Sequence, residues 1–194
     1  MRINKCLSPL RALVVRCAFI FAVGVSLAAL PVAAKSAPAS AAVPELGDGG
    51  MPDFYRLAAT PPARPGRLIR TEALTPAQSL EKAARSIRIL YSSTDGVDGT
   101  TPIAVSGAIF VPAGAPQKGG WPVIAWAHGT VGVADLCAPS FNARSPRDAA
   151  YLNHWLAQGY AVVASDYQGL GVYGGHPYLA TRPAAYSVLD SVRA

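Results

Sequence analysis

The sequence has few cysteines and few histidines, and each shortage excludes a class of site. Three cysteines occur among 194 residues, and two of them, Cys6 and Cys17, lie within the first 34. The remaining chain holds one cysteine and therefore cannot be stapled by internal disulfide bonds, which need pairs. The three histidines, His128, His154 and His176, stand far apart without ligand spacing, so we expect no metal site.

Positive charge is also scarce once the first 34 residues are set aside. The whole chain has 17 Lys and Arg residues against 11 Asp and Glu residues, for a formal net charge of +6. Four of the basic residues and none of the acids lie in residues 1–34, which leaves 13 against 11, or +2. No basic run remains in the rest of the chain. Composition therefore gives no support for nucleic-acid binding, and we expect no nucleic-acid partner.

The first 34 residues have the three parts of a secretory signal peptide. A basic start without acids precedes an apolar run over residues 18–30, and small residues follow up to Ala34. The apolar run is short for a membrane span, which needs about 20 residues. We expect cleavage after Ala34, a secreted or periplasmic protein, and no stable membrane span after cleavage. An uncleaved N-terminal anchor is the alternative.

The next part of the chain is divided by composition. Residues 35–74 are rich in Ala and Pro, which predicts a flexible lead, with residues 51–70 as extended coil lying on the domain. Phe54, Tyr55 and Leu57 are candidates to pin this coil to a surface. The folded domain is expected over residues 75–194.

The expected elements of that domain alternate between strands and helices. Capping by Thr75 and Gln78 predicts a short helix that runs to Ala84, and alternating apolar residues then predict an antiparallel hairpin from residues 87–91 and 103–111. The unbroken apolar runs 123–127 and 160–164 predict buried parallel strands. Between them, Ser145 is expected to cap a helix that Gly159 ends. A last helix is expected over residues 183–194, with apolar positions at Tyr186, Val188, Leu189 and Val192.

Polar and glycine residues follow both predicted parallel strands. The first strand runs into His128, Gly129 and Thr130, and the second into Asp166 and Tyr167. Ligands bind beyond the carboxyl ends of the strands in an open parallel sheet, so these loops are candidate walls of an active site. The alternatives are that residues 128–130 form only a turn and that Asp166 is an ordinary loop aspartate.

The chain matches one cofactor-binding motif and lacks one catalytic motif. Residues 169–174 match G-x-G-x-x-G, but Pro177 follows where a helix should face a pyrophosphate, and the preceding strand is not the first. We therefore expect no dinucleotide and no other cofactor. The nucleophile elbow G-x-S-x-G is absent from the sequence.

Longer patterns carry a family resemblance. WAHGTVGVADLCAPS (residues 126–140), GYAVVASDYQGLG (159–171), HPYL (176–179) and AYSVLDSVRA (185–194) resemble the secretory lipases of bacteria and fungi, which are α/β-hydrolases. The resemblance covers about residues 54–194 and only the N-terminal part of that family. It implies that Gly129 and Thr130 belong to the oxyanion-hole loop and that Cys137 has a disulfide partner outside this sequence. The family's nucleophile, acid and catalytic histidine have no matching positions here.

The resemblance predicts the N-terminal part of an α/β-hydrolase fold that ends before the nucleophile elbow. It also predicts a secreted ester hydrolase, lipase-like, acting on an ester or lipid substrate, of which this chain holds the oxyanion-hole half. By itself the chain is expected to be inactive. A catalytically dead fragment is one alternative. A secreted binding module, whose Trp121, Trp126 and Trp155 line a sugar or peptide site, is another.

Overall fold

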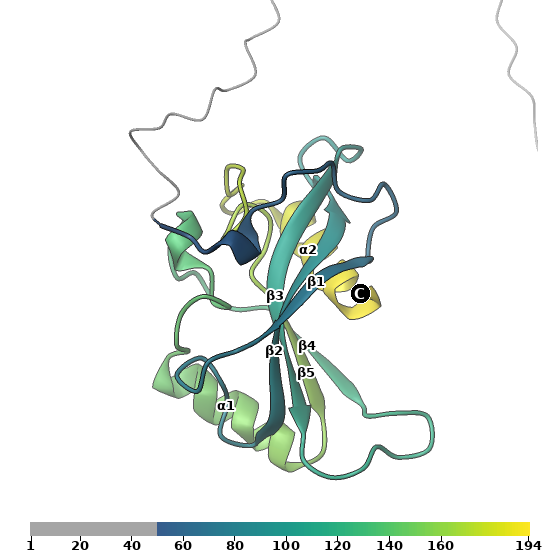
Figure 1. Ribbon diagram of the computed structural model, residues 1–194, viewed down its shortest axis with the longest axis vertical. Helices are drawn as coiled ribbons and strands as arrows, with labels where there is room; N and C mark the ends of the chain where they lie inside the picture. Colours follow the sequence, from purple (N-terminus) through teal and green to yellow (C-terminus); the bar gives the residue numbers. More distant parts are fainter. Residues whose placement is uncertain (1–49) are drawn as a thin grey trace, which may run out of the picture. The chain divides into compact units, whose positions relative to one another are not determined.

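The computed structural model describes residues 50–194, so the expected signal peptide and the start of the lead lie outside the described residues. The elements in chain order are η1 (Asp53–Tyr55), β1 (Leu68–Ala73), β2 (Ala83–Thr94), β3 (Pro102–Pro112), β4 (Val123–Trp126), η2 (Asp135–Cys137), α1 (Pro146–Ala157), β5 (Ala161–Ser165) and α2 (Thr181–Arg193). The strands, which Figure 1 labels, form a sheet in the order β1-β2-β3-β5-β4.

The sheet contains both pairing modes that the sequence predicts. β2 and β3 form the expected antiparallel hairpin, and β4 pairs with β5 in parallel through the crossover helix α1. β3 joins the two parts because it also pairs antiparallel with β5. This pairing is close at Gly107, where an added Cβ would lie 2.6 Å from the Ala164 carbonyl oxygen. Glycine is therefore required where the hairpin meets the parallel part.

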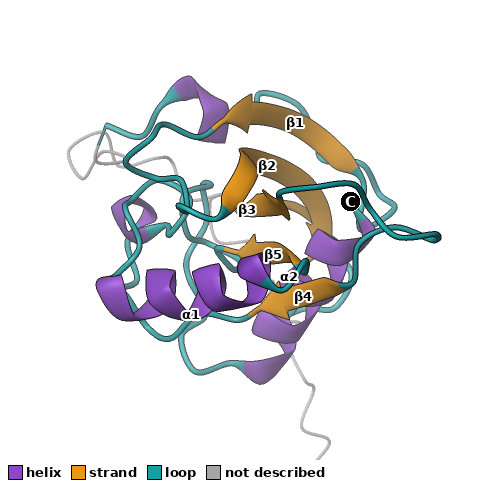
Figure 2. Ribbon diagram, turned by 90° about the horizontal axis from the view of Figure 1, so that it is seen from below, coloured by secondary structure: helices purple, strands orange, loops and turns teal. Residues whose placement is uncertain are grey.

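Helices cover both faces of the sheet. α1 packs Leu152 and Leu156 against one face, with Phe110 of β3 and Val162 of β5. The opposite face, with Ile89, Tyr91 and Val105 at its core, lies against α2, and Figure 2 shows the two helices on opposite sides of the strands. Successive residues of a strand point to opposite faces, so the long hairpin strands supply apolar residues to both cores.

Ser145 and Gly159 delimit α1 as expected. The Ser145 hydroxyl accepts from the Asp148 amide at 3.1 Å, and Pro146 occupies the first helical position. Gly159 follows the helix with a φ of 84°, a left-handed conformation that favours glycine. Local capping chemistry was sufficient to place both ends of this helix.

The helix expected from Thr75 to Ala84 is wrong. The predicted capping contact does form, since the Thr75 hydroxyl donates to Gln78 Oε1 at 3.0 Å, but the chain makes turns and enters β2 at Ala83. Gln78 is instead drawn into tertiary contacts: it accepts from Arg88 Nη2 at 3.0 Å and donates to the Phe141 carbonyl at 2.6 Å. The long pairing of β2 with β3 overrides the local helix signal.

The prediction of extended coil over residues 51–70 is correct only in part. Phe54 and Tyr55 are buried and fix this segment to the domain as predicted, but they lie in the short helix η1. The strand β1 was not expected from the sequence; it pairs antiparallel with β2 and forms one edge of the sheet. Residues 51–73 therefore pack within the same compact unit as the rest of the sheet.

The strand expected to be central and covered on both faces, β4, lies at the other edge of the sheet. Trp126 packs toward α1, but Val123 points to the opposite side and is 49% exposed. Parallel pairing with β5 was predicted correctly; burial on both faces was not.

The last helix forms as expected, with an unexpected orientation. α2 buries Ser187, Asp190 and Ser191 against the sheet, whereas Leu189 and Val192 are 54% and 46% exposed. The buried polar groups are paired. Ser93 Oγ donates to Asp190 Oδ2 at 2.7 Å, and the backbone N–H of Gln168 donates to Ser187 Oγ at 3.1 Å. Hydrogen bonds therefore hold the helix to the sheet.

Candidate active site

The loops after β4 and β5 meet at one edge of the sheet, as expected from their parallel pairing. His128 Nε2 lies 3.2 Å from the Asp166 carbonyl oxygen, and the Tyr167 hydroxyl donates to the His128 carbonyl at 2.9 Å. The two rings stack with centroids 4.3 Å apart. His128 and Tyr167 thus join the first loop to the second.

The His128 ring is buried and has a carbonyl oxygen at each nitrogen. Nδ1 lies 2.7 Å from the Gly129 oxygen, while Nε2 faces the Asp166 oxygen. A neutral imidazole has one N–H and satisfies one of these acceptors, whereas the protonated ring satisfies both. Because a backbone carbonyl oxygen lies beside each ring nitrogen, the ring is held within the loop.

The amides of Gly129 and Thr130 are among several donors that the loop after β4 leaves available. Within residues 50–194 neither amide donates a hydrogen bond to another group. The Gly129 carbonyl is held by His128, and the Thr130 hydroxyl lies 3.4 Å from the Tyr178 hydroxyl. Two adjacent N–H groups beyond the end of a parallel strand can bind a negatively charged oxygen.

Tyr167 occupies a strained backbone position beside this loop. Its φ is 74°, which is uncommon for a residue with a Cβ, and the conformation is held by the Tyr167 amide donating to Ser165 Oγ at 3.0 Å. Burial raises the pKa of the Tyr167 hydroxyl above its ordinary value. The phenol therefore stays protonated near neutral pH and serves as a hydrogen-bond donor to His128.

Asp166 points away from the expected active site. Its carboxylate is buried among the strands and accepts from the Ser106 hydroxyl at 2.7 Å and the Ser140 amide at 2.8 Å. The Ser140 hydroxyl also donates to it. Asp166 lines neither of the two cavities described below. Its backbone carbonyl, rather than its side chain, contacts His128, and the place of Asp166 in an active-site loop stays a prediction.

The buried carboxylate nevertheless positions the site. Burial raises the pKa of Asp166, while hydrogen bonds from two serines and a nearby arginine act in the opposite direction. Through Ser140 it ties the loop after β4 to β3 and β5. The Tyr55 hydroxyl, 2.8 Å from Ser140 Oγ, extends this network to η1, and burial raises the pKa of Tyr55 as well.

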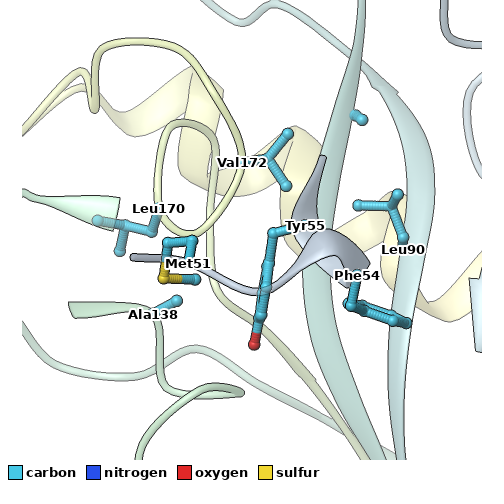
Figure 3. Packing of buried hydrophobic residues seen from close by; sticks show 8 residues of the cluster. Met51, Phe54, Tyr55, Leu90, Ala138, Leu170 and Val172 are labelled. Atoms are coloured by element: carbon cyan, nitrogen blue, oxygen red, sulfur yellow. The ribbon is translucent and has the colours of Figure 1, made fainter. Parts of the chain in front are cut away.

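Apolar packing around Tyr55 supports the same loops. Figure 3 shows the Tyr55 ring among side chains that come from separate parts of the chain. Ala138 belongs to the loop after β4, Leu170 and Val172 to the loop after β5, and Leu90 to β2. The segment at the start of the domain therefore braces both candidate active-site loops against the sheet.

The glycines of residues 169–174 have packing roles. Gly169 and Gly171 have φ values of 73° and 76°, and an added Cβ on Gly171 would lie 2.9 Å from Ser106 Oγ and from the Tyr55 ring. The next helix, α2, starts at Thr181, so no helix N-terminus faces the motif. The G-x-G-x-x-G match is explained by loop conformation and close contact.

Two cavities flank His128. The smaller, of about 260 Å³, is lined by Thr130, Tyr167, His176 and Tyr178, among others. The larger, of about 420 Å³, lies toward Leu136 and the N-terminus of α1. Thr130 and Tyr167, two of the predicted site residues, thus line the smaller cavity, and His128 lines both.

Three further expectations concern a metal site, Cys137 and the tryptophans. Among residues 50–194, no cluster of three or more His, Cys, Asp or Glu side chains has the geometry to hold a metal ion. Cys137 carries a free thiol. The expectation of a disulfide partner outside this sequence stays a prediction. Trp126 packs beside Tyr151, and Trp155 packs edge to face with Tyr160. These two tryptophans contribute to packing around α1.

Sequence reasoning missed the residues that support the loops from behind. Ser106 and Ser140 lie far apart in the chain, and a serine in a strand or a loop has no distinguishing pattern. No local sequence pattern indicates the burial of Asp166 either. Arg144 lines the larger cavity and belongs to no recognisable motif.

The comparisons with known proteins find matches among solved structures. No family model matches the sequence, and no curated protein matches it. The rice cell wall degrading esterase LipA from Xanthomonas oryzae is 31% identical, with a TM-score of 0.51, over 68% of this chain and 37% of that chain. Candida antarctica lipase A in its closed state is 21% identical, with a TM-score of 0.60, over 74% and 34% respectively.

These comparisons show the fold class. This chain spans little more than a third of the length of either neighbour. In the part that the structure describes, no helix is long and apolar enough to cross a lipid bilayer. The mixed sheet with helices on both faces, and its likeness to an esterase and a lipase, make the described residues part of an α/β-hydrolase fold.

Proposed function

We propose that this chain is the N-terminal part of a secreted serine carboxylic-ester hydrolase of the lipase type, and that it supplies the oxyanion-hole loop. The observation that carries the proposal is that the unengaged amides of the loop after β4 include those of Gly129 and Thr130, directly beyond the end of the strand. The likeness to an esterase and a lipase supports ester chemistry.

The proposed reaction needs residues outside this sequence. A serine hydroxyl, with its proton taken by a histidine, attacks the ester carbonyl, and the resulting oxyanion accepts hydrogen bonds from backbone amides. In this fold one donor follows the nucleophile and another comes from the loop after a preceding strand, here residues 129–130. The alcohol then leaves, and water hydrolyses the acyl-enzyme.

The cavities on either side of the loop over residues 128–130 support an ester or lipid substrate. His128 lies between two cavities, so groups on either side of a carbonyl held at residues 129–130 each have a place. Val131, Leu136 and Pro139 give the larger cavity apolar walls. The proposed assignment of Gly129 and Thr130 as oxyanion donors, with Tyr167 holding the loop through His128, requires no cofactor.

The proposal includes the organisation of the chain. Residues 1–34 are a signal peptide cleaved after Ala34, which delivers the protein to the periplasm or the exterior. The lead over residues 35–74 contributes η1 and β1 to the fold, so the segment from Met51 onward belongs with the catalytic domain. Residues 75–194 continue the N-terminal part of that domain, and the nucleophile elbow follows in the complete enzyme.

The first experiment is to read the genomic DNA past codon 194 and to assay the encoded products on p-nitrophenyl esters. We expect the reading frame to lead into a short apolar strand and G-x-S-x-G, and the longer product to hydrolyse the ester. Replacing the elbow serine by alanine should abolish turnover, and the 194-residue chain should show none above background. Full activity of the alanine variant, or turnover by the 194-residue chain, would contradict the mechanism.

A further inference from the structure

The Gly129 carbonyl and the Thr130 amide belong to the same peptide group. Within residues 50–194 no peptide bond is cis. A trans peptide is planar and places its C=O and its N–H on opposite sides, so the direction of one fixes the direction of the other. A contact that holds the Gly129 oxygen therefore also sets the direction in which the Thr130 N–H points.

Few other contacts restrain this peptide. Within residues 50–194, neither its oxygen nor its N–H forms a hydrogen bond with another backbone group. Glycine has wide conformational freedom, and the space beside the Gly129 Cα is open, since an added Cβ would meet no atom within 4 Å. The contact of the Gly129 oxygen with His128 Nδ1, at 2.7 Å, is thus the polar contact that can hold the peptide.

The two distances at the His128 ring indicate where its hydrogen lies. Nδ1 is 2.7 Å from the Gly129 oxygen, whereas Nε2 is 3.2 Å from the Asp166 oxygen. If Nδ1 carried no hydrogen, its lone pair would face an oxygen lone pair across the shorter of the two contacts and repel it. A hydrogen on Nδ1 makes this contact an ordinary hydrogen bond, in the neutral and in the protonated ring alike.

Tyr167 fixes the ring that carries this donor. The Tyr167 ring stacks on the His128 ring with centroids 4.3 Å apart, and the Tyr167 hydroxyl donates to the His128 carbonyl at 2.9 Å. His128 itself is only 8% exposed. Both the ring and the backbone of His128 are therefore held by one neighbouring side chain, which leaves Nδ1 little freedom to turn away from Gly129.

We propose that His128 is a positioning residue, whose Nδ1–H holds the Gly129 carbonyl and thereby aims the Thr130 N–H at the developing oxyanion. This inference rests on the proposed ester hydrolase and deepens it, because it assigns a role to a side chain that acts only through the backbone. With the hydrogen on Nε2 instead, the peptide would lose its donor and could turn. A backbone donor stabilises an oxyanion best when it is already oriented, since no reorganisation is then needed during the reaction.

Asparagine and glutamine separate the roles of the two ring nitrogens. The side-chain nitrogen of Asn is bonded to Cγ, as Nδ1 is, whereas that of Gln reaches about as far along the side chain as Nε2. His128→Asn can therefore keep a donor for Gly129, while His128→Gln keeps a donor only toward Asp166. Both variants lose the ring that stacks on Tyr167, so a difference between them reports the donor at Nδ1. His154→Asn and His154→Gln, at an exposed position of α1, are the control pair.

The first test is NMR spectroscopy of the isotope-labelled 194-residue protein, and it needs no turnover. Imidazole nitrogen shifts show which nitrogen of His128 carries a hydrogen, and the residual dipolar coupling of the Thr130 amide gives the direction of its N–H relative to the sheet. We expect a hydrogen on Nδ1 in the wild-type protein, an unchanged Thr130 direction in His128→Asn and a changed direction in His128→Gln. A wild-type Nδ1 without a hydrogen, or equal couplings in the two variants, would overturn the proposal.

The second test is steady-state kinetics of the longer, active product on a p-nitrophenyl ester. We expect His128→Gln to lower kcat by about 10²-fold with little change in KM, and His128→Asn to have a kcat at least about tenfold above that of His128→Gln. The two His154 variants should not differ from each other.

The outcomes distinguish this proposal from the proposed hydrolase. Equal kcat values for His128→Asn and His128→Gln, in an enzyme that still turns over the ester, would overturn the positioning role alone. Absence of turnover by the wild-type longer product would contradict the hydrolase, and the NMR test would then decide by itself whether His128 holds the peptide. The wild-type shifts need no variant, so they decide even where a substitution disturbs folding.

Discussion

Buried polar residues, rather than the exposed loop residues, set the geometry of the candidate site. Asp166 accepts hydrogen bonds from Ser106 and from the amide and hydroxyl of Ser140, and Ser140 in turn contacts Tyr55. One carboxylate thus connects η1, β3 and both loops at the sheet edge. Because a buried carboxylate is stable only when its oxygens are satisfied, the loss of one donor should be felt by the whole network.

At this scale we predict that Ser140→Ala lowers the free energy of unfolding by about 1–3 kcal/mol, since it leaves a buried carboxylate one donor short. Urea unfolding followed by fluorescence measures the change. Ser79→Ala, which removes an exposed hydroxyl bonded to the Thr75 carbonyl, is the control and should stay within about 0.5 kcal/mol. Equal losses for the two variants would mean that the network carries no special weight.

The same variant has a pH signature. Burial raises the pKa of folded Asp166 above its ordinary value of 3.8, so the folded state keeps the proton where the unfolded chain has lost it. This group therefore contributes most at low pH, and its contribution is lost as pH rises through the folded pKa. The Ser140 hydroxyl opposes the rise, so its removal should make the destabilisation by Ser140→Ala grow with increasing pH over that range. A difference independent of pH would contradict this account.

The elements differ in how well the local sequence predicts them. α1 begins and ends where its capping residues place it, because those contacts are made within the segment. Residues 75–84 carry an equally good capping pattern, yet Gln78 bonds to Arg88 and Phe141 and the chain enters β2. Partners distant in sequence decided that case, and no local pattern records them.

The sequence pattern also did not predict which side of α2 faces the sheet. The apolar residues of α2 have helical spacing, which predicted the helix correctly, but its polar side faces the sheet. Ser187 and Asp190 find partners on Gln168 and Ser93, residues that only the folded topology brings near. For the candidate site, the meeting of the two loops followed from parallel pairing, whereas the inward turn of Asp166 did not.

At the element scale we predict opposite outcomes for two leucine truncations. Leu152→Ala on α1 should cost about 2–5 kcal/mol, because this side chain is fully buried against the sheet. Leu189→Ala on α2 should cost less than about 0.5 kcal/mol, since Leu189 is 54% exposed. Chemical denaturation of both variants gives the comparison. A large cost at Leu189 would show that the outer face of α2 is covered in the folded protein.

The molecule as a whole places its backbone donors where two strands end. β3 pairs with β5, β5 with β4, and the hairpin is braced by η1, so the position of residues 128–130 depends on the full sheet. This arrangement resembles an esterase and a lipase over about two thirds of the chain, although the chain spans only about a third of either. In the proposed enzyme, this part supplies charge stabilisation, and the nucleophile comes from elsewhere.

The proposed division of labour predicts the effect of removing one donor in the longer, active product. Thr130→Pro deletes the amide N–H and should lower kcat by about 10²–10³-fold, as loss of an oxyanion donor does, with little change in KM. Thr130→Ala is the matched control because it keeps the amide and removes only side-chain atoms, the hydroxyl near Tyr178 among them. Steady-state kinetics on a p-nitrophenyl ester, with folding checked by near-UV circular dichroism, separates the two. A folded Thr130→Pro variant with wild-type kcat would exclude this amide from the mechanism, whereas a selective fall in kcat would tie this loop to the transition state.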